Sequence, residues 1–501
     1  MTSAGAPDLV TPPIDWLAVA PALALFAAAI TIVMVRSLLR RNPRVFAIAV
    51  ALSFAGLVAS AVSIVVQWRV VDRAGPYQAL AEMVAVDGFA VFVQAVVLGA
   101  TFLALLISIG YLRRHGVDGP EYLVLLLCSA TGMLLMASAN DLVIMFLAME
   151  ILSIALYVLA AFDRRRMASQ EAGLKYFILG SFASAVLLYG VALTYGATGT
   201  TNLTGIARFL AETTLLHDGV LLAGLALLIV GLGFKVAAAP FHMWTPDVYQ
   251  GAPTPVTAFM AAATKAAAFA AVLRVLTGAF SLYRVDWRPI VFVLAVASLL
   301  VGSIAAVTQT DVKRMLAYQS IAHAGYLLIA VQAASARGTA AALFYLCTYA
   351  VMATGAFAIV AVVGRDGDDR HGLSEYRGLA AARPVLAGLL TLFLLAQAGV
   401  PLTGGFVAKL SVFGAAVGAG QYWLALIGMI AAVVGAYVYL RIVLTMFAPA
   451  DDEAAPDGPA ITVDRGTGIA LTVAAVAIVL LGVVPGVVLD FARNATQLLA
   501  R

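Results

Sequence analysis

The sequence predicts an all-α polytopic membrane protein with about fourteen transmembrane helices, and three observations support that fold class. The chain has 501 residues, of which 63% are hydrophobic and only 11% are charged. Soluble domains carry about 25% charged residues, so this composition does not suit a water-exposed surface. Apolar runs long enough to span a bilayer recur along the whole chain. Two of these runs contain helix-breaking residues, which a bilayer tolerates only where protein or a watery cavity satisfies the freed backbone.

The predicted spans follow one another along the chain with charged or turn-forming residues between them. They are expected near residues 14–35, 45–66, 86–111, 122–138, 140–161, 171–195, 219–239, 255–277, 289–308, 315–333, 339–363, 384–419, 421–447 and 467–489. The seventh run continues into a proline-containing stretch that ends at Trp244, and the twelfth contains glycine and proline between residues 399 and 405. Both are therefore expected to be interrupted helices. Residues 200–217 have the spacing of a short amphipathic helix on the membrane surface.

The charge of the connecting loops predicts the orientation. Lysine and arginine are concentrated in one alternate set of loops, beginning with residues 36–44. Under the positive-inside rule this set faces the cytoplasm. With an even number of spans, both termini are then expected on the non-cytoplasmic side of the cell membrane.

Charged residues inside the predicted spans are the candidate functional residues. Only five of the 30 basic residues are lysines, and four of those five lie within apolar runs. A charge at the centre of a membrane helix costs about 2.5–3.5 kcal/mol, so each is expected to have a partner and a function. Glu150 and Lys265 lie near the middle of their runs, while Lys235 precedes one helix break and Lys409 follows the other. A buried lysine, unlike arginine, can release its proton, so these residues are predicted to transfer protons.

Two details of the proposed transfer follow from the residue types. Glu150 and Lys235 are expected to form an ion pair, whose opening beside the charge of Lys265 would favour release of the Lys235 proton. His323, in the tenth run, is predicted to relay protons between the two halves of the chain, because imidazole accepts and donates protons near neutral pH. The alternatives are structural ion pairs and, for His323, a hydrogen bond between helices.

Three further residues are weaker candidates for proton transfer. Lys175 follows Glu171 near a helix start, where it could take part in transfer or extend to the membrane surface. His242 and Asp247 flank the break of the seventh run and are expected to line a cytoplasmic access route. The sequence has no nucleotide, flavin or metal motif, and its net charge of +4 is explained by loop residues, so neither a cofactor, a metal nor nucleic acid is predicted as a ligand.

Four motifs resemble the antiporter-like membrane subunits of respiratory complex I, the NADH–quinone oxidoreductase. The first runs from Gly231 to Asp247 (GLGFKVAAAPFHMWTPD) and continues to Pro255. The other three, most similar to the N-type subunits, are residues 173–184 (GLKYFILGSFAS), 311–323 (DVKRMLAYQSIAH) and 399–409 (GVPLTGGFVAK). The resemblance covers nearly the whole chain. One departure from the M-type subunits is the lysine at position 409, where those subunits typically have glutamate.

The resemblance implies fourteen helices, with helices 4–8 and 9–13 as inverted repeats and helices 7 and 12 broken. The segments would be residues 1–112 (three helices), 113–280 (first repeat), 281–447 (inverted repeat) and 448–501 (a cytoplasmic loop and helix 14). It also implies that protons cross the membrane along a central hydrophilic axis. The residues of that axis would be Glu150, Lys235, Lys265, His323 and Lys409.

The resemblance also implies partners and cofactors. The chain would bind other membrane-arm and peripheral-arm subunits of complex I and the lipid bilayer. NADH, FMN, iron–sulfur clusters and quinone would be bound in those other subunits, so this chain would contribute to a translocase without redox catalysis of its own. A subunit of a monovalent cation/proton antiporter, which shares the fold, is the alternative function. A third hypothesis is a membrane scaffold whose buried ion pairs only fix helix packing.

Overall fold

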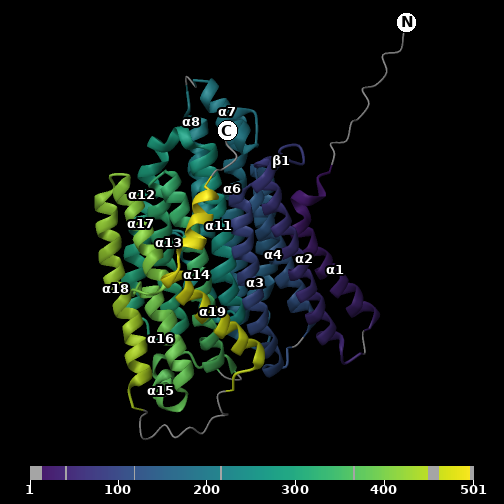
Figure 1. The fold of residues 1–501 in the computed structure, drawn as a ribbon, viewed down its shortest axis with the longest axis vertical. Helices are drawn as coiled ribbons and strands as arrows, with labels where there is room; N and C mark the ends of the chain where they lie inside the picture. Colours follow the sequence, from purple (N-terminus) through teal and green to yellow (C-terminus); the bar gives the residue numbers. More distant parts are fainter. Residues whose placement is uncertain are drawn as a thin grey trace.

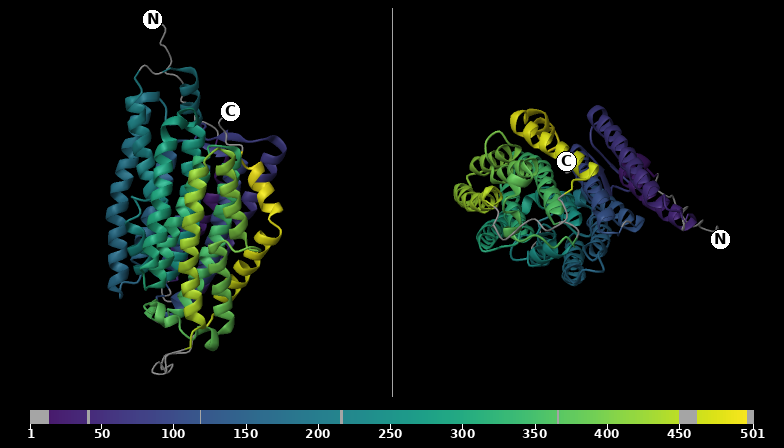
Figure 2. Two further views of the ribbon diagram at one scale, coloured as in Figure 1. Left: turned by 90° about the vertical axis from the view of Figure 1, so that its left-hand side faces the viewer. Right: turned by 90° about the horizontal axis from the view of Figure 1, so that it is seen from below.

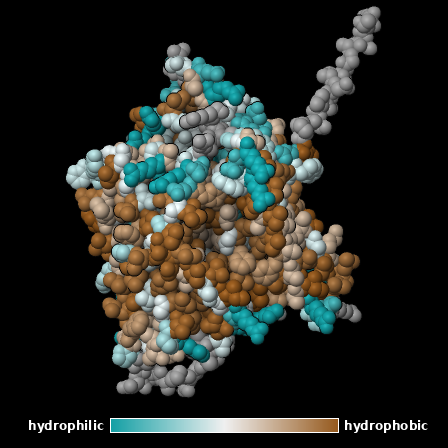
Figure 3. Space-filling model, in the orientation of Figure 1, coloured by the Kyte–Doolittle hydropathy of each residue, from teal (hydrophilic) through white to brown (hydrophobic). Residues whose placement is uncertain are grey.

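The chain forms a bundle of long helices that run between two polar ends (Figure 1). A belt of hydrophobic side chains lies between hydrophilic groups at the top and bottom of the view in Figure 3. Among the described residues, eleven helices are long and apolar enough to cross a membrane, which supports a multi-pass membrane protein. The computed structural model describes residues 14–39, 42–117, 119–214, 217–364, 367–449 and 462–496.

The helices of the first half begin close to the expected positions, although α2 and α6 continue several residues further. The long helices are α1 (Trp16–Leu38), α2 (Val45–Ala74), α3 (Gly88–Arg114), α4 (Pro120–Ser138), α5 (Leu142–Ala160) and α6 (Met167–Thr198). The short surface helix expected within 200–217 is α7 (Leu203–Glu212). The next segments are α8 (Gly219–Lys235), α9 (Trp244–Gly251), α10 (Thr254–Phe259) and α11 (Lys265–Leu273), with π-helical turns at Met260–Thr264 and Arg274–Ala279.

The second half has the same plan of long helices with one interruption. Its segments are α12 (Arg284–Val307), α13 (Val312–Gln332), α14 (Ala336–Val363), α15 (Leu379–Ala382), α16 (Pro384–Ala398), α17 (Gly404–Gly418), α18 (Tyr422–Phe447), α19 (Arg465–Val483) and α20 (Gly486–Asn494). Figure 2 shows α1 and α2 at one edge of the bundle. The acidic stretch 451–453, expected in a cytoplasmic loop, lies outside the described residues.

The all-helical fold is confirmed, and a small β-hairpin is added to it between α2 and α3. Strand β1 (Tyr77–Ala79) pairs antiparallel with β2 (Val84–Val86), so that Tyr77 lies opposite Val86. The turn between them places Leu80, Ala81 and Glu82 at positive φ. This hairpin could not be predicted from the sequence, because each strand has only three residues and the turn lacks the glycine or asparagine that marks most tight hairpins.

Both expected helix breaks are present. The first separates α8 from α9 and the second separates α16 from α17. Each contains a non-glycine residue in the left-handed region, Ala237 with φ 61° and Leu402 with φ 69°, a conformation that costs about 1–2 kcal/mol. In the first break the backbone N–H of Ala239 donates to Ser298 Oγ at 2.8 Å. Side chains of neighbouring helices therefore satisfy backbone groups that the interruption frees.

The centre of the bundle is the span that contains α10 and α11 together with α14. The apolar window of the span Thr254–Ala279 is 100% buried and that of α14 is 89% buried, whereas only 33% is buried in α1 and α19. Since a lipid-facing helix exposes one side to the bilayer, the outer helices form a sheath around these two. A side chain on α10, α11 or α14 is thus shielded from the lipid by other helices.

One buried ion pair ties three of these segments together near the hairpin. Arg274 donates from both Nη atoms to the Asp87 carboxylate at 3.0 and 2.8 Å, and from Nε to the carbonyl of Ala137 at 2.9 Å. The two side chains are 3% and 0% exposed. Asp87 is also the N-cap of α3, where its side chain accepts from the Ala90 N–H. The pair therefore joins the start of α3, the end of α4 and the end of the central span.

We expect Arg274→Gln to destabilise the protein by about 3–5 kcal/mol, because it leaves the Asp87 carboxylate buried without its cation. The measurement is the thermal unfolding of the purified protein in detergent. Adding Asp87→Asn should recover part of the loss, since no unpaired charge then remains. The matched control is Arg370→Gln, which opens the exposed Arg370–Glu375 pair and should change stability by less than about 1 kcal/mol. Equal losses of thermal stability in Arg274→Gln and Arg370→Gln would contradict the conclusion that the buried Arg274–Asp87 pair stabilises the fold.

Candidate functional site

Lys235 and Glu150 lie in the same region without forming the ion pair that the sequence predicted. The Lys235 ammonium, at the C-terminal end of α8, donates to Ser153 Oγ at 2.7 Å and to the Tyr176 hydroxyl at 3.3 Å. The Glu150 carboxylate instead accepts a hydrogen bond from the Ser184 hydroxyl. Ser153 is one helical turn after Glu150 on α5, so it occupies the place expected for the carboxylate. The expectation of a closed pair was wrong for this conformation.

Lys265 lies at the start of α11, directly after a π-helical turn in the central span. Its ammonium donates to Ser320 Oγ at 2.7 Å and to the Ser320 backbone carbonyl. The Tyr349 hydroxyl donates to the same Ser320 oxygen at 2.8 Å, and the ammonium lies 5.2 Å from the centre of the Tyr349 ring. π-Turns are frequent at functional sites, because the extra residue changes the direction of the following side chains.

His323 follows Ser320 by one turn on α13 and is hydrogen-bonded through both ring nitrogens. Its Nδ1 is 2.6 Å from the Tyr345 hydroxyl and its Nε2 is 3.0 Å from the Tyr439 hydroxyl. Because Tyr439 donates to Gln397 Oε1 at 3.2 Å, its oxygen is available to accept from Nε2–H. A neutral imidazole protonated at Nε2 and accepting at Nδ1 satisfies all of these contacts.

Lys409 reaches back across the second helix break. Its ammonium donates to the carbonyl of Ala398, the last residue of α16, at 2.8 Å and lies 4.9 Å from the centre of the Tyr326 ring. Gly399 follows with φ 90°, and a Cβ there would be 2.9 Å from Lys409 Cδ. Glycine is thus required at this position both for the backbone conformation and for the lysine side chain to pass.

Hydroxyl groups and aromatic rings connect these residues into two groups. In one group, α13 joins Lys265 to His323, and the Tyr326 ring lies between His323 and Lys409, at 5.8 Å from the imidazole. In the other, Ser153, one turn after Glu150 on α5, accepts a hydrogen bond from Lys235. From Lys235, the stacked rings of Tyr176 and Trp244 lead to Tyr249 on α9, with ring centres 4.6 and 6.1 Å apart.

The neutral partners of the charged residues were not predicted from the sequence. These partners are Ser153, Tyr176, Ser184, Ser320, Tyr326, Tyr345, Tyr349 and Tyr439. A weak signal was present in α14, where Tyr345 and Tyr349 are spaced to share one face of an otherwise apolar helix.

The three weaker candidates lie outside the buried groups. Lys175 is partly exposed and pairs with Glu171 at 2.7 Å and with Asp247 at 2.8 Å. Asp247 also accepts from Arg314 at 2.7 Å, so these residues form a surface cluster of ion pairs. His242 is half-buried, and its Nδ1 has no hydrogen-bond partner among the described residues. The described residues also contain no group of three or more His, Cys, Asp or Glu side chains that could hold a metal ion.

A fully buried carboxylate, Asp368, organises a separate polar cluster in the loop after α14. It accepts from the Tyr111 hydroxyl at 3.0 Å, from Arg166 at 3.0 Å and from the N–H of Thr254 at 3.0 Å. His371 Nε2 is 2.9 Å away, and the buried Lys313 ammonium is 3.8 Å away. Because Thr254 is the first residue of α10, the cluster fixes the start of the helical span that carries Lys265.

The electrostatic balance at Asp368 favours the ionised form. Burial by itself raises the pKa of this carboxyl group. Three contacts outweigh this effect of burial and hold the pKa of Asp368 well below its usual range. They are the charge of Lys313, the hydrogen bond from His371 and the charge of Arg166. The carboxylate is therefore a permanent anion that joins loops from both halves of the chain.

The chain is similar over most of its length to known proteins. Residues 139–435 match the transmembrane family described as NADH:quinone oxidoreductase/Mrp antiporter. The chain is 42% identical over 449 residues to NADH-quinone oxidoreductase subunit N of Trichlorobacter lovleyi, covering 89% of this chain and 90% of that relative. It is 43% identical over 523 residues to NADH-quinone oxidoreductase subunit N of Salinispora arenicola, covering 98% and 99%.

Solved structures of membrane complexes share the fold. A chain of respiratory complex I from Thermus thermophilus, solved with bound aureothin, matches with a TM-score of 0.78 and 33% identity, over 94% of this chain and 99% of that chain. A chain of the Mrp complex from Dietzia sp. DQ12-45-1b matches with a TM-score of 0.82 and 21% identity, over 97% and 98%. At the latter identity the likeness shows the fold alone.

The Asp368 cluster generates a pH-dependent prediction. Asp368→Asn should lower thermal stability, because it leaves the charges of Lys313 and Arg166 without their anion, at a cost of about 3–5 kcal/mol. Because the pKa of Asp368 is lower in the folded than in the unfolded state, its ionised form stabilises the fold at every pH above the ordinary aspartate pKa of about 3.9. This stabilisation is lost as the pH falls through the lowered pKa. The melting difference from wild type should therefore persist from about pH 6 to pH 5 and shrink only in stronger acid. Asp369→Asn, an exposed neighbour, is the control; a difference that already disappears at pH 6 would contradict the assignment.

Proposed function

The chain belongs to the family of NADH-quinone oxidoreductase subunit N, and we propose that it moves protons along the buried side chains of α5, α8, α11, α13 and α17. It is a proton-translocating membrane subunit of that oxidoreductase and functions with the other membrane-arm and peripheral-arm subunits. The NADH, flavin, iron–sulfur and quinone chemistry belongs to other subunits. A cation/proton antiporter remains the alternative, but the two relatives named above, 42% and 43% identical, are oxidoreductase subunits.

The observation that carries this mechanism is the neutral surroundings of three buried ammonium groups. Lys235, Lys265 and Lys409 are 4%, 3% and 8% exposed, and each donates to hydroxyl or carbonyl oxygens. Among the described residues, none of the three has a carboxylate within ion-pair distance. A buried ammonium without a counter-ion is held by weaker interactions than an ion pair, so a small change nearby is sufficient to release its proton.

We infer a sequence of transfers that runs from Glu150 through Lys235, Lys265 and His323 to Lys409. Closing of the Glu150–Lys235 pair would hold the proton on Lys235, and the open arrangement described above would release it towards Lys265. The neutral His323 then accepts at Nδ1 and donates at Nε2, so a proton can pass without the imidazole leaving its place. The serines and tyrosines around these groups would guide the proton, together with water.

The surface cluster near Tyr176 supports an access route for protons. Lys175 immediately precedes Tyr176, whose hydroxyl contacts Lys235, and Lys175 is bonded to Asp247. His242 lies in the break between α8 and α9. We propose that these groups connect the cytoplasmic solvent to Lys235 and that Lys409 lies on the exit side.

The topology is proposed to contain fourteen spans in two inverted repeats. Eleven helices qualify as spans by length and composition, and the remaining three would be α8 with α9, α13, and α16 with α17. The repeats would occupy residues 113–280 and 281–447, each with one broken helix that contains a left-handed residue. The first and last described residues lie at the same end of the bundle in Figure 1, as an even number of spans requires. We place that end on the non-cytoplasmic side.

Lys235→Arg tests proton release directly. We expect it to reduce proton translocation at least tenfold, because arginine keeps the positive charge but does not release its proton. Proton uptake and NADH oxidation are measured together in membrane vesicles that contain the assembled complex. Arg208→Lys, an exposed exchange of one cation for another on α7 outside the proposed route, is the control and should translocate normally.

Two results would reject the proposal. Normal translocation by Lys235→Arg would show that release from this residue is not required. Normal translocation by Lys235→Ala in a fully assembled complex would favour the scaffold hypothesis.

Sidedness is tested by labelling of single cysteines. In a variant in which Cys128 and Cys347 are replaced by alanine, Arg208→Cys adds a thiol on α7 and Arg370→Cys adds one near the Asp368 loop. A membrane-impermeant maleimide applied to intact spheroplasts should label only the Arg208→Cys variant, and lysis should make the Arg370→Cys variant reactive. The reverse pattern would overturn the orientation.

A further inference from the structure

The last turn of α16, just before the second helix break, contacts two parts of the candidate site. The Gln397 side chain accepts a hydrogen bond from the Tyr439 hydroxyl at 3.2 Å, and the same hydroxyl lies 3.0 Å from His323 Nε2. The carbonyl of the next residue, Ala398, accepts from Lys409 at 2.8 Å. Adjacent residues of one helix end are thus hydrogen-bonded to Lys409 and to the partner of His323.

The orientation of the Gln397 amide is set by a backbone carbonyl of α14. Its Nε2 donates to the carbonyl of Met352 at 3.5 Å. A carbonyl oxygen only accepts, so the amide nitrogen must face Met352 and the amide oxygen must face Tyr439. Since the amide oxygen also only accepts, the Tyr439 hydroxyl donates its proton to Gln397. Gln397 and Tyr439 are 4% and 1% exposed, so bulk water offers neither side chain another partner.

This donation decides which nitrogen of the neutral His323 ring carries the hydrogen. Because the Tyr439 proton is directed to Gln397, the Tyr439 oxygen accepts from His323, and Nε2 must carry the hydrogen. Nδ1 then accepts from the Tyr345 hydroxyl at 2.6 Å. Tyr345 has no second hydrogen-bond partner among the described residues, so its hydroxyl is free to donate or to accept and does not select the tautomer. The selection depends on Gln397.

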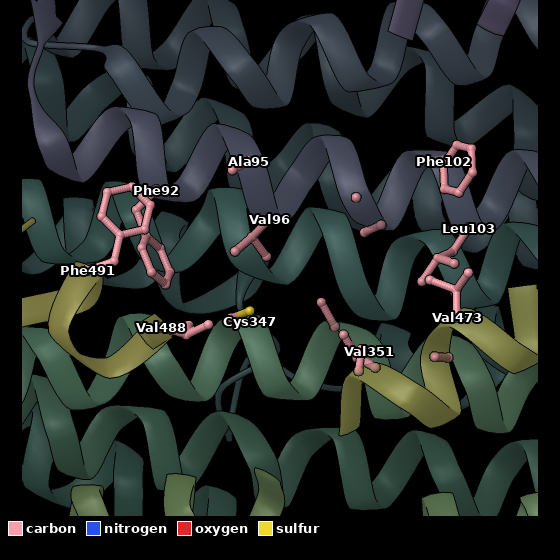
Figure 4. Close-up of a pocket in the computed structure, with 15 residues that line it drawn as sticks. Phe92, Ala95, Val96, Phe102, Leu103, Cys347, Val351, Val473, Val488 and Phe491 are labelled. Carbon is pink, nitrogen blue, oxygen red and sulfur yellow. The ribbon is translucent and has the colours of Figure 1, made fainter. Parts of the chain in front are cut away.

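The apolar side of α14 supplies no water to the His323 ring. Cys347 and Val351 of this helix line an apolar crevice of about 320 Å³ together with residues of α3, α19 and α20 (Figure 4). Apolar cavities do not hold water stably, so the crevice offers no water molecule that would compete with Tyr345 for Nδ1. On this side of the ring, the contact with the Tyr345 side chain is therefore the one that counts.

We propose that Gln397 is a positioning residue that fixes the tautomer of His323 through the Tyr439 hydroxyl. The inference rests on the relay proposed above, in which His323 takes up a proton. With its hydrogen on Nε2, the ring accepts a proton only at Nδ1, on the side of Tyr345. The imidazolium that forms then directs its other hydrogen at Tyr439, towards the helix end that binds Lys409. Without the Gln397 oxygen, the Tyr439 hydroxyl is free to donate to Nε2, and the opposite tautomer is favoured.

The first test measures the tautomer of His323 in the assembled complex labelled with ¹⁵N-histidine. Solid-state NMR distinguishes protonated from unprotonated ring nitrogens, and the His323 signals are those that are missing in His323→Gln. The wild type should carry the hydrogen on Nε2, whereas Gln397→Leu should move it to Nδ1. Tyr439→Phe, which cuts the same link at its other end and keeps the ring, should move it too. Gln94→Leu is the matched control and should leave the tautomer unchanged, because Gln94 is a buried glutamine whose Nε2 donates to the carbonyl of Leu134, outside the proposed route.

Proton translocation by the same complexes is the second measurement. Gln397→Leu should reduce it about tenfold, the shift that one buried hydrogen bond produces in an equilibrium between two tautomers. Adding Gln397→Leu to Tyr439→Phe should cause no further loss, because the link to His323 is then already cut. A purely structural role of Gln397 in the helix break would instead add its own loss in that background. Gln94→Leu should translocate normally.

The outcomes separate this inference from the relay on which it rests. A wild-type ring with its hydrogen on Nδ1, or a tautomer that stays the same in Gln397→Leu, would overturn the positioning role. A loss of translocation as large in the double variant, relative to Tyr439→Phe, as in Gln397→Leu alone would overturn it as well. A tautomer that moves to Nδ1 while translocation stays normal would support the positioning role and would reject the relay through His323 instead.

Discussion

The cost of placing a charged group inside a bilayer is the constraint on which this structure depends. Each buried ammonium must find oxygen atoms within the protein, because neither lipid nor bulk water is available to it. In the second half, the helix break supplies a backbone carbonyl at Ala398, to which Lys409 is bonded. In the first half, Lys235 lies at the C-terminal end of α8, where the helix dipole favours a positive charge. Each break thus places a backbone carbonyl or a helix C-terminus beside a buried ammonium group.

The same constraint explains where the carboxylates lie. The strongly bonded anions Asp87 and Asp368 are at the ends of the bundle, where each pairs with a cation and fixes the start of a helix. Within the described part of the chain, the three lysines of the candidate site have only neutral partners. Strong ion pairs therefore hold the helices in place, and the groups proposed to exchange protons remain loosely bound. This division allows proton movement without disturbing the anchors of the fold.

Hydropathy and charge position predicted most of the helices and the depth of the charged residues, because the bilayer imposes both along the sequence. They did not predict the partners of those residues. Ser153 takes the Lys235 ammonium instead of Glu150, although both face the same side of α5. Which of the two side chains contacts Lys235 depends on how α5, α6 and α8 pack. Helices that are apolar on all sides have little hydrophobic periodicity, so their packing cannot be predicted from the sequence. The burial of Lys313 beside Asp368 could not be predicted from the sequence for the same reason.

The two halves of the candidate site are not equivalent, and this difference gives the proposed relay a direction. Lys235 has a titratable carboxylate nearby on α5, so movement of Glu150 can change the charge of its surroundings. Lys265 and Lys409 are bonded to Ser320 and to the carbonyl of Ala398, which have fixed charge. They can respond only to a neighbour that gains or loses a proton. In the proposed relay an electrostatic change would then enter at Glu150 and pass through Lys235 before it reaches Lys265.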